Sequence, residues 1–298
     1  MGLIHSARQA KHAAFVANKR TRRVLGAGKW RALTAVTPAL SKIRPYRYDA
    51  QRYAGRNRGR EGHELAFLQM DPPADTSPSE LPRRVFVLWT GENQMTANRA
   101  RNFNRLREVI EVPVVLITPA TLQEWLVPGH PLHPAYKYLS LVHRSDYLRA
   151  YLMHHHGGGY IDLKAPLGSW GAAFDRAQAD PTAWVTSYGE VNAKASARFP
   201  GPMGRDIALY WKQLVGTSAM IARSHTPFTG EWLREVERRL DSLAGRLTEN
   251  PGDVRLGGPG YPVSWTDLLG KVYQPLQLKY FHHIRVDNDL LVGFSEYQ

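Results

Sequence analysis

From residue 84 onward the chain alternates short apolar runs with helix-compatible segments, and this alternation restricts the fold more than any other feature. Val85–Trp89 and Val114–Ile117 are continuous apolar runs, which are typical of strands buried on both faces. The polar segment 96–109 between them is compatible with a helix. The three together predict a βαβ unit with parallel strands and a right-handed crossover.

The rest of this region continues the alternation. A long helix is predicted over 138–155, and it should stop at the glycines 157–159. Later elements are expected as strands over 160–163, 184–188 and 218–222 and a helix over 227–247. The order predicts an α/β domain whose Rossmann-like, mainly parallel sheet is flanked by helices.

The positive charge is concentrated in the first sixty residues. Residues 1–60 hold fifteen Lys and Arg against one acid, Asp49, in a chain of net charge +13. We therefore divide the chain into a basic, partly helical arm (1–60), a proline-rich linker (61–83) and a folded domain (84–298). The arm has the charge to dock on an anionic membrane surface. Nucleic acid is the less favoured partner, because the arm has no recognisable nucleic-acid module and few aromatic residues.

Several classes of protein are excluded or disfavoured. The chain has no cysteine, which excludes disulfides, thiolate zinc sites and cysteine nucleophiles. No apolar run approaches the roughly 20 residues of a transmembrane helix. Cations interrupt every apolar stretch near the N-terminus, so no secretory signal is expected. We expect a cytoplasmic protein, peripheral at the inner face of the membrane.

An acid and an arginine lie one turn apart on the predicted helix 138–155. Asp146 and Arg149 share a face, whereas Leu148 and Leu152 point about 200–240° away from Asp146. The leucines are therefore expected to pack on the sheet while the Asp–Arg pair faces elsewhere, into a cleft. The alternative is a surface ion pair, worth under about 1 kcal/mol.

A second acid follows the glycine break. The glycines 157–159 end the helix and let backbone approach a ligand closely. Asp162 then falls near the carboxyl end of a strand, where open α/β sheets bind ligands. It could ligate a divalent cation or accept from a ribose hydroxyl, or it could simply close the strand before a turn.

Seven residues in this stretch share one spacing pattern: Ser145, Asp146, Arg149, Gly158, Gly159, Tyr160 and Asp162. The stretch 140–164 resembles the sugar-binding region of glycosyltransferases with an Asp-x-Asp motif, in particular family 32. That family includes yeast-type initiating mannosyltransferases and bacterial capsule and lipopolysaccharide enzymes. Two more segments match in order, namely Pro82–Gly91, with Trp89, Thr90 and Gly91, and Gly258–Asp267, with Gly258, Pro259 and Asp267.

The resemblance implies a GT-A fold and a retaining hexosyltransferase. The donor would be a nucleotide sugar, and the acceptor a glycan or lipid-linked glycan in surface polysaccharide or glycolipid synthesis. By the same resemblance Trp89 would border the base, Asp146 and Arg149 would contact the donor sugar, and Asp162 the ribose or a metal-bound water. The other matching residues would line the donor site.

Lys164 departs from the family pattern, which has a metal-ligating acid at this position. A protonated lysine cannot ligate Mn²⁺ or Mg²⁺ and would repel it. Lys164 could itself neutralise the leaving diphosphate, a metal could bind through Asp162 and ligands elsewhere, or catalysis could be lost. The first two together are favoured because the other motif positions are intact.

Histidines are further candidates for metal ligands. The consecutive His154, His155 and His156 diverge by about 100° per residue and cannot converge on one ion. His283 remains a candidate ligand, because the resemblance implies a C-terminal histidine at the metal or diphosphate. Two other functions stay open, namely a catalytically inactive module that binds nucleotide sugars or glycans, and a nucleic-acid-binding protein that uses the arm.

Overall fold

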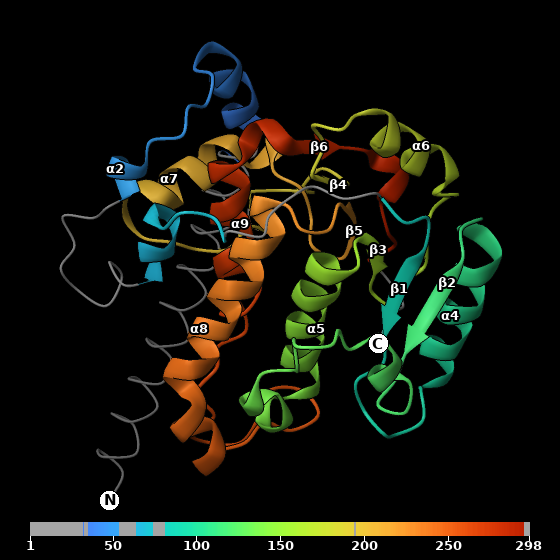
Figure 1. The fold of residues 1–298 in the computed structure, drawn as a ribbon. Helices are drawn as coiled ribbons and strands as arrows, with labels where there is room; N and C mark the ends of the chain where they lie inside the picture. The colour runs from blue at the N-terminus through green and yellow to red at the C-terminus, as the bar shows by residue number, and fades with distance from the viewer. Residues whose placement is uncertain (1–31, 33–34, 54–63, 74–80, 194, 295–298) are drawn as a thin grey trace, which may run out of the picture.

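The computed structural model describes residues 32, 35–53, 64–73, 81–193 and 195–294. The described residues form an α/β fold around one six-stranded sheet, in the order β2-β1-β3-β5-β4-β6 (Figure 1). The strands are β1 (Val85–Leu88), β2 (Val114–Ile117), β3 (Gly158–Ile161), β4 (Val185–Ser187), β5 (Ala219–Ala222) and β6 (Ile284–Val286).

Helices lie on both faces of this sheet (Figure 1). The α-helices are α2 (Ala50–Tyr53), α4 (Ala97–Val109), α5 (Leu141–His155), α6 (Gly171–Ala179), α7 (Gly201–Tyr210), α8 (Pro227–Glu249) and α9 (Gly270–Lys279). Residues 35–43 are also helical, and we call them the N-terminal helix. No helix in the described part of the chain is both long and apolar enough to cross a bilayer.

Strand direction confirms the α/β class and refines it. β1 pairs in parallel with both β2 and β3, and β4 pairs in parallel with β6. β5 lies between β3 and β4 and is antiparallel to both. The βαβ unit predicted from the two apolar runs is therefore present, while the sheet is mixed, with β5 running against the other five strands.

The alternation of side chains along β1 separates two hydrophobic cores. Val85 and Val87 pack with residues of α4 and α6 on one face. Phe86 and Leu88 pack with residues of α5, α8 and α9 on the other face. A continuous apolar run is required here because both faces of the strand are buried.

Two predicted boundaries shift around the candidate site. The helix predicted from 138 begins at Leu141, because Ser140 caps it and accepts a hydrogen bond from the backbone N–H of His143. The preceding Pro134–Tyr138 forms a separate 3-10 helix. β3 begins at Gly158 and ends at Ile161, two residues earlier than predicted, so Asp162 follows the strand directly.

The described parts of the predicted arm and linker pack on the folded domain. Arg52 forms a bidentate ion pair with Asp206 of α7, at 2.6 and 2.7 Å, and the Tyr53 hydroxyl donates to the same carboxylate. Phe67 and Leu68, in the predicted linker, are buried. The other residues of the predicted arm, 1–31, 33–34 and 54–60, lie outside the described residues.

Candidate functional site

The start of α5 is held by two segments far from it in sequence. The Thr90 hydroxyl, just after β1, donates to the carbonyl of Leu141 at 2.7 Å. The Tyr261 hydroxyl accepts from the backbone N–H of Ser140 at 3.1 Å and lies 2.8 Å from His143 Nδ1. The three stretches that carry the sequence motifs, 82–91, 140–164 and 258–267, therefore meet at the N-terminal end of α5.

Asp146 and Arg149 form a buried pair, so the surface-ion-pair interpretation is wrong. Their residues are 4% and 5% exposed, and the closest approach between the charged groups is 3.6 Å. The arginine points at the sheet, contrary to the prediction that the pair faces away from it. Its guanidinium donates to the Thr217 carbonyl and to the Tyr160 hydroxyl, at 2.9 Å each.

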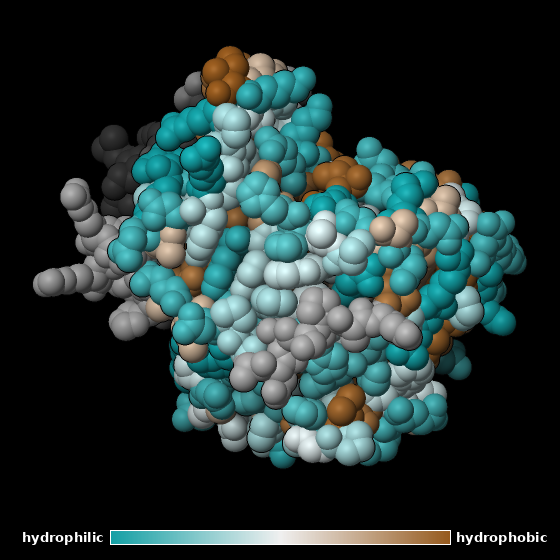
Figure 2. All heavy atoms as spheres, turned by 45° about the horizontal axis from the view of Figure 1, so that its top comes forward, coloured by the Kyte–Doolittle hydropathy of each residue, from teal (hydrophilic) through white to brown (hydrophobic). Residues whose placement is uncertain are grey.

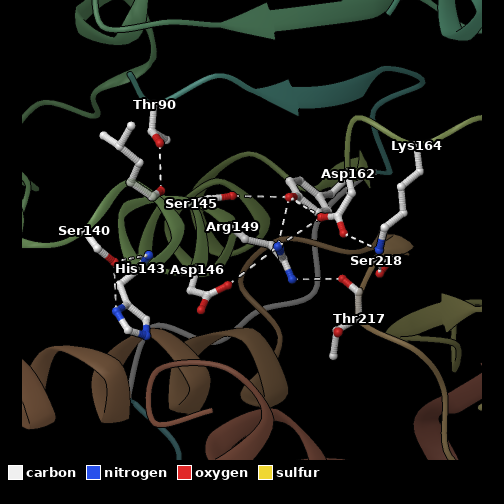
Figure 3. A network of polar contacts seen from close by, with 12 residues as sticks. Thr90, Ser140, His143, Ser145, Asp146, Arg149, Asp162, Lys164, Thr217 and Ser218 are labelled. Atoms are coloured by element: carbon white, nitrogen blue, oxygen red, sulfur yellow. Dashed lines mark hydrogen bonds and ion pairs between the residues drawn. The ribbon is translucent and has the colours of Figure 1, made fainter. Parts of the chain in front are cut away.

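Asp162 lies between two cations at the carboxyl end of β3 (Figure 3). Its Oδ1 accepts from the Tyr160 hydroxyl at 2.8 Å and from Arg149 at 3.2 Å. Its Oδ2 accepts from Lys164 Nζ at 2.9 Å, and the same ammonium donates to Ser218 Oγ at 2.6 Å. Lys164 therefore completes an ion pair with the acid that the motif predicts as a ligand.

The pKa values of the two carboxyl groups in this network are shifted in opposite directions from the ordinary value of an aspartate. Burial pushes the pKa of Asp162 upward, but the charges of Lys164 and Arg149 outweigh it and hold the pKa at about 2. Burial raises the pKa of Asp146 to about 7, because the charge of Arg149, which lowers this pKa, offsets burial only in part. At neutral pH Asp162 is ionised, whereas Asp146 can gain or lose a proton.

Asp162 has the most solvent-exposed of the four charged side chains in the network. The side chains of Asp146 and Arg149 are each 6% exposed, and that of Lys164 is 11% exposed. The Asp162 side chain is 24% exposed. A ligand that reaches this site would therefore meet the Asp162 carboxylate first, with Lys164 and Arg149 beneath it.

The donor set does not fit a divalent cation. Both oxygens of Asp162 already accept from cations, and Lys164 Nζ lies 2.9 Å from Oδ2, where a metal would need to bind. Within the described residues, no group of three or more His, Asp or Glu side chains is placed to hold a metal ion.

His283 does not lie with Asp162. It precedes β6, at the amino end of the strands, whereas Asp162 follows β3 at the carboxyl end. Its ring stacks on Trp184 with centroids 3.5 Å apart, and its Nδ1 lies 2.9 Å from the Thr182 carbonyl. The predicted pairing of His283 with Asp162 around one ion is therefore wrong, because one residue lies at the amino ends of the parallel strands and the other at their carboxyl ends.

The residues after β1 border the site through packing. The indole N–H of Trp89 donates to the Asn93 carbonyl at 2.7 Å, so its polar edge is occupied by its own loop. A Cβ on Gly91 would overlap Asn93 Oδ1 and would lie 2.8 Å from a methyl carbon of Leu141, so Gly91 packs closely against the start of α5. Ser145, on α5, places its hydroxyl 3.4 Å from that of Tyr160.

Gly158 and Gly159 are needed for close packing within the sheet, and their part in a donor site stays a prediction. Gly158 has φ +90°, and a Cβ there would lie 2.9 Å from the Arg84 carbonyl. A Cβ on Gly159 would lie 2.9 Å from a methyl carbon of Val85. Both glycines lie at the amino end of β3, and they allow its close approach to β1.

The segment 258–267 contributes through a residue that the motif does not include. Gly258 and Pro259 are exposed. Asp267 accepts from the Ser264 N–H at 2.9 Å and pairs with Lys271 at 2.9 Å, so it stabilises its own turn. The direct link to α5 is made by the Tyr261 hydroxyl, described above.

Other residues of the network lay outside the predicted set. Thr217 and Ser218 directly precede β5, the strand that runs antiparallel to β3, and no local motif marks them. Near the end of the chain, the ring of Phe294 lies 5.2 Å from Lys164 Nζ. Of the residues that sequence reasoning missed, only Ser140 could have been found from local sequence, because serine is a common cap at the start of a helix.

Comparison with known proteins adds no relative. No model of a protein family matches the chain, and no curated protein matches it. The resemblance to family 32 therefore stays a prediction, based on the spacing of the motifs.

Proposed function

We propose that the protein is a glycosyltransferase that uses a nucleotide-sugar donor and a glycan or lipid-linked glycan acceptor, with Lys164 in place of a divalent cation. The observation that carries the proposal is the Lys164 ammonium, which lies 2.9 Å from the motif acid Asp162 at the carboxyl end of β3. Open α/β sheets bind ligands at that edge. The order and spacing of the motifs give further support.

The chemistry requires cations beside the leaving group. The bond between the anomeric carbon and the diphosphate oxygen breaks, and a bond from that carbon to the acceptor oxygen forms. Negative charge grows on the diphosphate, and the departing phosphate oxygen takes the proton of the acceptor hydroxyl. Fixed positive groups stabilise that charge most strongly where water is excluded. Arg149 stays protonated, since the opposing effects of Tyr160, Asp162 and Asp146 outweigh burial and raise its pKa. Lys164 supplies the second cation by exchanging Asp162 for a phosphate oxygen.

The two acids have separate roles in this proposal. Asp162 stays ionised and, once Lys164 turns to the diphosphate, accepts from a ribose or sugar hydroxyl. Asp146, whose pKa is raised to about 7 by burial, can donate to or accept from a sugar hydroxyl near neutral pH. This division needs no catalytic base, in keeping with a retaining transfer.

A non-catalytic binding module is the second candidate, and the burial of the network favours it. Two acids and two cations cancel one another's charge, and the side chains of Asp146, Arg149 and Lys164 are each at most 11% exposed. A network that is already satisfied stabilises the charge that grows on a leaving diphosphate less than a set of free cations would. Turnover is therefore the deciding measurement.

The test incubates the full-length protein with a panel of nucleotide sugars and quantifies the nucleoside diphosphate released, in EDTA and in Mn²⁺. We expect turnover of at least one donor that EDTA does not remove. Lys164→Met should lower that turnover about a hundredfold, the order seen when one charge-stabilising group is lost. Lys212→Met, at an exposed lysine, is the matched control. Binding of a donor without turnover would favour the binding module, and turnover that needs Mn²⁺ would contradict the role of Lys164.

A further inference from the structure

The N-terminal helix, residues 35–43, is oriented with its polar residues inward. Thr37 and Ser41 are 4% and 6% exposed. Val36, Leu40 and Ile43 are 54%, 47% and 83% exposed. A helix on the surface of a soluble protein normally shows the opposite arrangement, with its apolar stripe buried.

The exposed apolar residues form one row along the helix. At about 100° per residue, Val36, Leu40 and Ile43 fall within about 60° of one another, whereas Thr37 and Ser41 lie about 100–140° from Val36. Figure 2 shows hydrophobic atoms at the protruding end of the molecule where this helix lies. The row is thus a continuous stripe and not a scatter of single exposed residues.

Contacts with the folded domain fix the helix in this orientation. The Trp211 indole N–H donates to the Thr37 hydroxyl at 2.8 Å. The Tyr210 hydroxyl donates to the Arg44 carbonyl at 2.9 Å, just beyond the helix. Tyr46 packs edge-on against Tyr210, with ring centroids 5.0 Å apart. The outward direction of the apolar row therefore follows from how the helix is attached.

The charge around the row identifies what can cover it. Lys42, Arg44 and Arg47 are exposed on or just after the helix. They belong to the segment 1–60, in which fifteen cations accompany one acid. A second copy of the chain would bring two such segments together, and their charges would repel. A nucleic acid would meet the cations but would leave the apolar row without a partner.

We propose that the N-terminal helix docks on an anionic lipid surface. Val36, Leu40 and Ile43 enter the interface between headgroups and acyl chains, while Lys42, Arg44 and Arg47 meet the lipid phosphates. This surface depends neither on a donor nor on turnover. Failure of the proposed glycosyl transfer and failure of lipid docking are therefore separate results.

The test is flotation of the full-length protein with vesicles, in the absence of any donor. We expect binding to vesicles of equimolar phosphatidylcholine and phosphatidylglycerol, and much weaker binding to phosphatidylcholine alone. The triple variant V36S/L40S/I43S should lose at least about tenfold in affinity, because three apolar side chains no longer enter the interface. The triple variant K42Q/R44Q/R47Q should lose about fivefold in affinity for the vesicles per charge removed, and this loss should be smaller at high salt.

The control removes apolar side chains elsewhere. Val191 and Val254 are 45% and 70% exposed, and V191S/V254S should float like the wild type. All variants should keep the wild-type circular dichroism and melting temperature, since the altered side chains are exposed. Equal flotation of V36S/L40S/I43S and the wild type would overturn the proposal. So would a dimer in light scattering that this variant abolishes, or binding to a duplex oligonucleotide with none to the vesicles.

Discussion

The middle and the C-terminal end of α5 bury ionisable side chains in opposite ways. In the middle, Asp146 and Arg149 join an ionic network in which acids alternate with cations. At its C-terminal end, the ring of His154 lies 4.8 Å from that of His155 and 4.9 Å from that of His225. Burial alone does not decide whether a group keeps its charge.

The difference lies in the sign of the neighbours. Among the acids, Asp162 has a pKa of about 2 although it is largely buried, because two cations face it. Burial and the repulsion of neighbouring histidines lower the pKa of His154 to about 4 and that of His155 to about 3. The middle of the helix therefore carries charge at neutral pH, whereas the histidines at its C-terminal end are neutral.

The largest expected effect comes from removing the central cation of the network. Arg149→Met would leave Asp146 and Asp162 facing each other in a buried site, and we expect a loss of about 3–5 kcal/mol in the free energy of unfolding. Urea denaturation at neutral pH measures this. Arg83→Met, at an ion pair with Asp175 exposed on both sides, should cost under about 1 kcal/mol. Equal losses in the two variants would refute a special role for burial.

A double-mutant cycle tests the pairing of Lys164 with Asp162. We expect Lys164→Met and Asp162→Asn to couple by about 1–3 kcal/mol in the free energy of unfolding, because each leaves the partner's charge without its hydrogen-bonded counter-ion. Additive losses would contradict the ion pair at 2.9 Å.

The histidine end of the helix should respond to acid. The folded-state pKa values of His154 and His155 lie below the unfolded value of about 6.5, so the folded state binds fewer protons than the unfolded chain. Their contribution to stability is complete above that value, and it is lost as the pH falls towards 4 and 3. The double variant His154→Gln/His155→Gln should reduce the slope of the unfolding free energy against pH between about pH 6 and 4. The reduction should correspond to up to about two fewer protons taken up on unfolding.

The control for this experiment is His282→Gln, because that histidine is exposed. The slope should remain as in the wild type. A double variant that keeps the full wild-type slope would show that other groups govern the acid response.

The smallest expected effect concerns one hydroxyl in the network. Tyr160→Phe removes the donor to Asp162 Oδ1 and an acceptor of Arg149, and it should cost about 1–2 kcal/mol of unfolding free energy. Tyr273→Phe is the matched control, since the hydroxyl of this buried tyrosine meets only the Met220 sulfur among the described residues, at 3.9 Å. Equal costs would mean that the Tyr160 hydroxyl adds nothing specific.

Elements with strong local signals could be predicted from the sequence. The apolar runs that contain Val85 and Val114 became parallel strands with a helix between them. The sequence predicts Gly158 and Gly159 as part of the glycine stop of the helix, whereas they are the first two residues of β3. Contacts with β1 decide their conformation instead, and those contacts lie over seventy residues away in sequence.

The site was predicted in part. Asp146, Arg149, Asp162 and Lys164 do come together, as their spacing indicated. The direction of Arg149 could not be read from the helix period, because its long side chain reaches back to the sheet. The inward face of the N-terminal helix depends on Trp211, 174 positions later, which no local pattern reveals.

The left-handed backbone at the start of β3 limits how this site can change over generations. Gly157 has φ +60° and Gly158 has φ +90°, and a Cβ on either would meet backbone atoms within 3 Å. The strand therefore cannot slide, and Asp162 stays four residues from a fixed point, about 13 Å along an extended chain. Selection can alter the chemistry here by replacing side chains such as Lys164, but it cannot move the acid.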